Sequence, residues 1–103
     1  MIELIENNRA ELATLCERYH VSRLELFGSA TDPSRFDAAK SDVDFLVAFL
    51  PLEPGQHADA YFGLLEGLRE LLGRPVDLVV DRAIRNRYFR QAVDHSRTVV
   101  YAA

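Results

Sequence analysis

The sequence is poor in several residue types, and each shortage excludes a class of protein. It holds one cysteine, Cys16, and no tryptophan among 103 residues. A single cysteine cannot form an internal disulfide framework or a cysteine-based zinc cage. No apolar run approaches the roughly 20 residues that span a bilayer, and the acidic first residues lack the basic start of a signal peptide. We therefore expect a cytoplasmic protein without membrane segments.

Lysine is also scarce: the sequence contains one lysine, Lys40, and eleven arginines. The net charge is −4, and so acidic a chain is poorly suited to neutralising phosphates, so we expect no direct nucleic-acid partner. The charges are unevenly distributed: residues 1–81 carry a net −8, whereas residues 82–103 hold five arginines and Asp94, a net +4. The basic end either faces an anionic partner or is simply solvated, and the composition leaves both interpretations open.

The length and the 49% hydrophobic content suit one globular domain spanning residues 1–103. Apolar residues at helical spacing predict helices over about the first seventeen residues, over 57–72 and over 84–95. Alternating or continuous apolar runs predict strands over 21–27, 43–49 and 76–80, with a short closing strand at 97–101. The polar residues 30–41 predict a loop or a frayed helical turn. This order favours an α/β (α+β) fold, a small mixed β-sheet with helices packed on it.

Two side-chain arrangements follow from the helical spacing. Cys16 lies on the apolar face of the first helix and is expected in the core. The last helix is expected to turn four residues inward, namely Ile84, Tyr88, Phe89 and Ala92. Its Arg90 and Asp94 lie four residues apart and could pair on the outer face. The three histidines have no metal-ligand spacing, so we assign them no chemistry.

Three aspartates lie in or directly beside apolar strands, where burying a carboxylate is energetically unfavourable. Asp42 and Asp44 lie two residues apart at the start of an apolar strand, so both point to the same face. Adjacent carboxylates repel unless a cation lies between them, and such oxygens suit Mg²⁺. Asp77 interrupts another apolar strand, where an unpartnered carboxylate is unfavourable. If these two strands are neighbours, Asp77 approaches the other two and completes a metal-and-base triad.

Gly28 and Ser29 end the first predicted strand abruptly. Glycine allows a phosphate to approach the backbone closely, serine adds a hydroxyl donor, and a following helical turn would present free N–H groups. Alone, each is also an ordinary turn or cap residue. A Gly-Ser after one strand, an Asp-x-Asp opening the next and an isolated Asp in a third together form a far more specific pattern.

These segments resemble the minimal nucleotidyltransferase (MNT) family within the DNA polymerase beta-like nucleotidyltransferase superfamily. The resemblance lies in Leu26-Phe27-Gly28-Ser29-Ala30-Thr31, Ser41-Asp42-Val43-Asp44-Phe45-Leu46-Val47 and Gly73-Arg74-Pro75-Val76-Asp77-Leu78-Val79, and extends over nearly the whole chain. It implies a polymerase-beta-like nucleotidyltransferase fold. Many such proteins are antitoxins that transfer AMP from ATP to a tyrosine of a HEPN-domain ribonuclease toxin and silence it.

The resemblance also implies a role for each motif residue. Gly28 and Ser29 hold the nucleotide triphosphate, and Asp42, Asp44 and Asp77 form the catalytic and metal site. Two Mg²⁺ ions are expected there, with ATP as the substrate and Asp77 helping to deprotonate the attacking hydroxyl. The expected partner is a HEPN ribonuclease toxin, and so small a chain is expected to form a homodimer or a hetero-oligomer.

One departure from the family pattern weakens this expectation. Relatives commonly carry an arginine shortly after Gly-Ser-Ala, where this sequence has Asp32, and Arg35 or Lys40 would have to reach the phosphates instead. Arg85 and Arg90 are further candidates for a phosphate or a toxin. The alternative is therefore a weak or inactive transferase that neutralises its toxin by binding alone. An enzyme acting on a small aminoglycoside-like molecule is disfavoured, because 103 residues leave little surface for an acceptor pocket.

Overall fold

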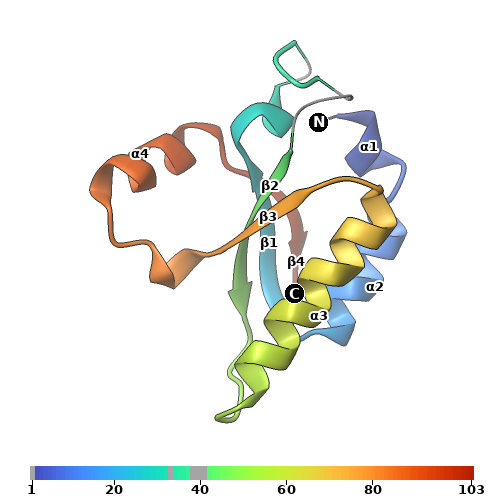
Figure 1. Cartoon of the computed structure of the whole chain (residues 1–103), viewed down its shortest axis with the longest axis vertical. Helices are drawn as coiled ribbons and strands as arrows, with labels where there is room; N and C mark the ends of the chain where they lie inside the picture. Colours follow the sequence, from blue (N-terminus) through green and yellow to red (C-terminus); the bar gives the residue numbers. More distant parts are fainter. Residues whose placement is uncertain (1, 33, 38–41) are drawn as a thin grey trace.

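The computed structural model describes residues 2–32, 34–37 and 42–103. Its elements, drawn in Figure 1, are α1 (Glu3–Glu6), α2 (Arg9–Arg18), β1 (Val21–Phe27), the 3-10 turn η1 (Gly28–Thr31), β2 (Val43–Phe49), α3 (Gln56–Leu72), β3 (Val76–Val80), the 3-10 turn η2 (Asp81–Ala83), α4 (Arg87–Ser96) and β4 (Thr98–Ala102). The predicted order of helices and strands is confirmed. No helix in the described residues is long and apolar enough to cross a membrane.

The first predicted helix is wrong as a continuous element, since it divides into α1 and α2 at Asn7 and Asn8. The Asn8 side chain donates a 2.8 Å hydrogen bond to the Leu4 carbonyl oxygen, which lies in the last turn of α1. Asparagine competes in this way with the backbone hydrogen bonds of a helix, and the interruption lets α1 and α2 adopt different directions (Figure 1).

The four strands form one mixed sheet in the order β3-β2-β1-β4. β1 pairs antiparallel with both β2 and β4, whereas β2 and β3 are parallel and are joined through α3. Gly73, at a φ of +64°, ends α3 and donates its N–H to the Arg69 carbonyl oxygen. The predicted mixed sheet is confirmed, and β3 lies beside β2 as the argument about Asp77 required.

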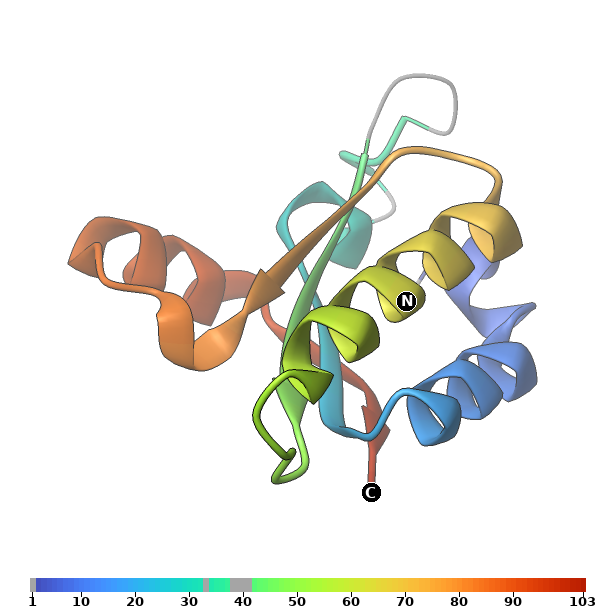
Figure 2. The same ribbon diagram turned by 60° about the horizontal axis from the view of Figure 1, so that its bottom comes forward.

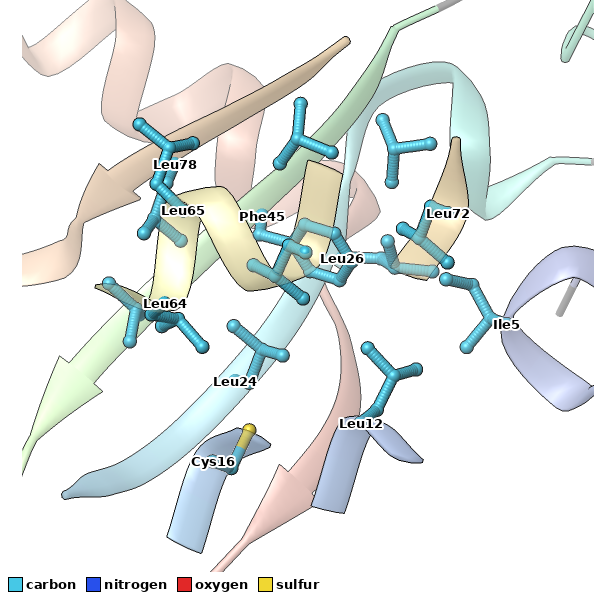
Figure 3. Close-up of a cluster of buried hydrophobic side chains, with 14 of the residues drawn as sticks. Ile5, Leu12, Cys16, Leu24, Leu26, Phe45, Leu64, Leu65, Leu72 and Leu78 are labelled. Carbon is cyan, nitrogen blue, oxygen red and sulfur yellow. The ribbon is translucent and has the colours of Figure 1, made fainter. Parts of the chain in front are cut away.

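The main core lies between the sheet and the layer formed by α2 and α3 (Figure 3). Side chains two residues apart on β1, Leu24 and Leu26, meet Leu12 of α2 and Leu64 of α3, and all four are fully buried. Cys16 lies in the same core, as predicted, and burial raises the pKa of its thiol to about 12. The thiol therefore serves as a small apolar side chain.

The last helix, α4, lies on the opposite side of the sheet from α2 and α3 (Figures 1 and 2). It begins at Arg87, because the Asn86 side chain caps it by accepting hydrogen bonds from two backbone N–H groups. Val93 is its buried residue and packs on Phe27 and Leu46.

The prediction that four residues of this helix turn inward is therefore mostly wrong. Tyr88 is 67% exposed, Phe89 is 40% exposed, and Ala92 is also exposed, whereas Ile84 precedes the helix and is half-buried. Val93 packs on the sheet and the Phe89 ring meets Phe27, whereas Tyr88 and Ala92 remain in solvent.

A buried ion pair connects the C-terminal segment to the sheet. Glu25 of β1 is 3% exposed and accepts two hydrogen bonds from Arg97, at 2.8 and 2.9 Å. These bonds hold the pKa of Glu25 below its ordinary value. Arg97 also pairs with Asp94, and Arg90 pairs with Asp81, so the predicted pair between Arg90 and Asp94 is replaced by two others. A carboxylate this buried needs such partners to remain charged.

We expect Arg97→Ala to lower the free energy of unfolding in urea by about 2–3 kcal/mol, because it leaves the Glu25 carboxylate buried with only a peripheral partner. Arg23→Ala is the matched control: Arg23 also pairs with Glu25, but its side chain is 54% exposed, and its loss should cost less than about 1 kcal/mol. Because the pKa of Glu25 is lowered, the stabilisation in the wild type is lost as the pH falls through that pKa. Equal losses in the two variants would contradict this account.

Candidate active site

The carboxylates of β2 and β3 are brought together by the pairing of the two strands. Asp44 lies directly opposite Asp77 in the parallel register, and both belong to the sheet face away from α3. Partial burial, the hydrogen-bonding contact with Asp77 and the charges of Asp77 and Asp42 together raise the pKa of Asp44 to about 6. Each of these causes disfavours a second negative charge at this point of the sheet.

Asp42 lies immediately before β2 and is exposed. It is near enough to affect the Asp44 carboxyl electrostatically. Among the described residues, however, no three His, Cys, Asp or Glu side chains lie close enough together to hold a metal ion. The structure thus brings two of the three predicted aspartates into contact and leaves the third at the entrance to the strand.

This donor set suits a hard divalent cation. Mg²⁺ takes oxygen ligands and usually binds through one or two carboxylates, with water and phosphate oxygens completing its shell. Asp44 and Asp77 supply two carboxyl groups in contact. Partial burial and the neighbouring carboxylates raise the pKa of Asp44, and a bound cation would favour its charged form. The residues present therefore fit Mg²⁺, with Asp42 available at the edge.

Gly28 follows β1 and lies against this pair. Its φ is +74°, and a Cβ atom at this position would lie 2.7 Å from Asp44 Oδ2, so no other residue fits without displacing the carboxylate. The expectation of a free amide here is wrong, because the Gly28 N–H donates a 2.9 Å hydrogen bond to Ser96 Oγ at the end of α4. Ser29 follows in η1 and is half-buried.

Two clefts flank the aromatic pair formed by Phe27 and Phe89, whose rings meet edge to face with centroids 5.9 Å apart. The cleft here called the acidic cleft has a volume of about 400 Å³, and its charged lining residues are Asp44, Asp77 and Arg69. The cleft called the basic cleft has a volume of about 440 Å³ and is lined by Phe27, Gly28, Arg35, Phe89, Ala92, Val93, His95 and Ser96.

A third, larger cleft of about 590 Å³ lies between α2 and α3. It contains none of the predicted site residues, and three glutamates, Glu11, Glu66 and Glu70, line it. The residues of the predicted motifs therefore lie outside this larger cleft.

The segment after Gly28 carries the departure noted in the sequence. The Asp32 carboxylate accepts hydrogen bonds from the backbone N–H and the hydroxyl of Ser34, which lower its pKa. Arg35 follows in this turn and lines the basic cleft. Lys40, the other cation considered for the phosphates, lies outside the described residues, as does Ser41.

Sequence reasoning missed Phe89, Ser96 and His95 as residues near the predicted site. Phe89 was assigned to the core, and His95 was given no chemistry. Ser96 is separated from Gly28 by 68 residues, so no local pattern could reveal their contact. Of the two arginines suggested for a phosphate or a toxin, Arg90 is engaged by Asp81, and Arg85 is exposed.

Comparison with known proteins adds independent findings. The model of a family described as "Nucleotidyltransferase domain" matches residues 11–100. The "Putative protein adenylyltransferase MJ0128" of Methanocaldococcus jannaschii is 36% identical over 80 residues, covering 78% of this chain and 76% of the relative. The solved structure of a "putative minimal nucleotidyltransferase" is 30% identical with a TM-score of 0.72, covering 94% of this chain and 95% of that chain.

A further solved structure shares the fold at lower identity. It is the complex of a tri-AMPylated HEPN toxin of Shewanella oneidensis with its MNT antitoxin, and it matches with 20% identity and a TM-score of 0.64. The match covers 96% of this chain and 73% of that one.

We expect Asp44→Asn to stabilise the protein in the absence of divalent cations. At pH 8 the wild type carries a charge that burial and Asp77 disfavour; its removal should raise the free energy of unfolding by about 1–2 kcal/mol. A raised pKa means that the wild type regains this stability as the pH falls below about 6, so the two proteins should converge near pH 5. Asp42→Asn, at an exposed carboxylate, is the control and should have a smaller effect. Urea titrations at pH 8 and pH 5 measure the difference in the free energy of unfolding between variant and wild type. An Asp44→Asn protein less stable than the wild type at pH 8 would contradict the idea that the Asp44 charge is unfavourable there.

Proposed function

The chain belongs to the nucleotidyltransferase domain family, and from this premise we propose that it transfers AMP from ATP to a hydroxyl of a partner protein. The partner we propose is a HEPN ribonuclease toxin, modified on a tyrosine, so that the chain acts as its antitoxin. The observation that carries the proposal is the contact of Asp44 with Asp77 directly beside Gly28. The names of the similar proteins, an adenylyltransferase and an antitoxin bound to an AMPylated toxin, support it.

The reaction we propose is an in-line displacement at the α-phosphorus. The acceptor oxygen forms a bond to that phosphorus, the bond to the oxygen bridging the α- and β-phosphates breaks, and pyrophosphate leaves. The proton of the acceptor hydroxyl passes to the Asp77 carboxylate and from there to water. Gly28 and Ser29 hold the phosphates, and the glycine allows them close to the carboxylates because a side chain there would meet Asp44.

Asp44 and Asp77, together with Asp42, would hold Mg²⁺ at this site. The bound ion would neutralise phosphate charge and lower the pKa of the acceptor hydroxyl. The carboxylates lie near the N-terminal ends of β2 and β3, where they orient the phosphate and the acceptor hydroxyl. The acidic cleft beside them, closed on one side by Phe27 and Phe89, gives the acceptor side chain a largely apolar approach.

The test uses the chain with its HEPN partner, ATP labelled at the α-phosphate, and Mg²⁺. We expect the Asp42→Asn, Asp44→Asn double variant to lose more than about 100-fold in the rate of labelling, because it removes charged groups that act on the reacting phosphate. The matched control is Asp59→Asn with Glu70→Gln, which removes the same charge from exposed positions of α3. Circular dichroism establishes that both proteins fold, and labelling that survives in the first variant refutes the proposed site.

The same double variant distinguishes catalysis from neutralisation by binding alone. Binding alone is the second candidate function, because Asp32 occupies the position where relatives commonly carry an arginine. An antitoxin that acts by transfer loses its protection of toxin-expressing cells together with the labelling. An antitoxin that acts by binding still protects cells although no label enters the toxin. Loss of both in the double variant, with neither lost in the control, supports transfer as the means of neutralisation.

A further inference from the structure

A further cleft, of about 320 Å³, lies at the C-terminal ends of β2 and β3, which run parallel toward it (Figure 1). Its walls come from these strand ends, the first turn of α3, the turn η2 and α4. Phe49, the last residue of β2, lies five residues beyond Asp44, which is roughly 16 Å at the rise of a strand. This cleft, here called the terminal cleft, is therefore separate from the candidate active site.

Three basic side chains and one carboxylate line the terminal cleft, namely His57 of α3, Arg82 of η2, Arg90 of α4 and Asp81. Arg90 pairs with the Asp81 carboxylate and also donates a 2.7 Å hydrogen bond to the Asp81 carbonyl oxygen. Arg97 Nη2 lies 3.7 Å from the other carboxylate oxygen of Asp81. Asp81 and Arg90 are thus occupied within the protein, and Asp81 has no charge to spare for another cation.

The ion pairs connected to Asp81 form one network with equal numbers of acids and bases. Its members are Glu25, Asp81, Asp94, Arg23, Arg90 and Arg97. Three carboxylates thus meet three guanidinium groups, and the formal charge of the network is zero. Among the residues that the structure describes, Arg82 takes part in no ion pair. Its guanidinium therefore gives the terminal cleft an uncompensated positive charge.

A hydrogen bond holds this cation at the cleft, although the Arg82 side chain is exposed. Arg82 Nη2 lies 2.9 Å from His57 Nε2. Because a guanidinium can only donate, the imidazole nitrogen is the acceptor and the His57 ring is neutral. That ring meets the Phe49 ring edge to face, with centroids 5.8 Å apart. His57 is therefore a positioning residue, and it leaves the remaining N–H groups of Arg82 available to a ligand.

We propose that the terminal cleft binds a phosphate group, either as inorganic phosphate or as the phosphomonoester of a small molecule, and that Arg82 holds it. The planar guanidinium matches phosphate oxygens with parallel, charge-assisted hydrogen bonds. The Phe49 ring and Val80 provide apolar surface for the part of a phosphomonoester beyond its phosphate. The site lies away from the paired carboxylates, so it does not depend on the transfer of AMP.

The experiment is an NMR titration of the intact, isotope-labelled protein with inorganic phosphate, phenyl phosphate and acetate. Divalent cations are left out, so that the bare carboxylates of Asp44 and Asp77 repel these anions from the candidate active site. We expect both phosphates to shift the backbone amide signals of Phe49, His57 and Arg82. Tighter binding of phenyl phosphate assigns the site to a phosphomonoester, and tighter binding of inorganic phosphate assigns it to the free ion.

Arg82→Ala should weaken the binding of both phosphates by about 10- to 100-fold, the range for lost hydrogen bonds to a charged group. Arg82→Lys should fall between this variant and the wild type, since it keeps the charge but not the planar fork. Arg18→Ala is the matched control, because it removes the same charge from an exposed position that lines the cleft between α2 and α3. It should bind phosphate as the wild type does.

Four results would overturn the proposal. One is a wild-type protein that binds neither phosphate, and another is an Arg82→Ala protein that binds them within about twofold of the wild type. Signals that shift around Gly28 and Arg35 instead would place the anion in the basic cleft. Acetate that binds as tightly as phosphate would show a site for any small anion rather than for a phosphate group.

Discussion

The parallel pairing of β2 with β3 is the constraint on which the rest of the site depends. Because side chains alternate along a strand, the burial of Phe45, Val47 and Leu78 under α3 sends Asp44 and Asp77 to the opposite face. A slip of one residue would bury carboxylates in the core and expose the apolar side chains. The hydrophobic core therefore enforces the contact of two like charges, and that contact is the feature from which the proposed chemistry starts.

The second constraint is the attachment of the C-terminal segment to the other side of the sheet. Val93 packs on Phe27 and Leu46, and Arg97 binds the buried Glu25 carboxylate. These few contacts leave most of α4 exposed but hold its last turn against Gly28. A helix anchored at one end in this way forms a wall for both clefts without covering the carboxylates.

Part of the positive charge at the C-terminal end is neutralised by ion pairs within the protein. Arg90 and Arg97 belong to the basic end, and they neutralise Asp81, Glu25 and Asp94. Arg85 and Arg87 remain exposed beside Tyr88, and Arg87 lies over the Tyr88 ring. Neither interpretation of the basic end covers Arg90 and Arg97, which form ion pairs within the protein, whereas Arg85 and Arg87 are solvent-exposed.

The sequence by itself determined the strands, the helix α3 and the buried Cys16, because each follows from the spacing of apolar residues along one segment. It also indicated the family, since the motif residues stand close together within three short segments. Only the tertiary structure decided which residues surround them. The contacts of Gly28 with Ser96 and of Glu25 with Arg97 join residues 68 and 72 positions apart, and Val93 is the residue of α4 that is buried against the sheet. Periodicity reports which side of a helix is apolar, but the neighbouring elements decide whether that side is covered.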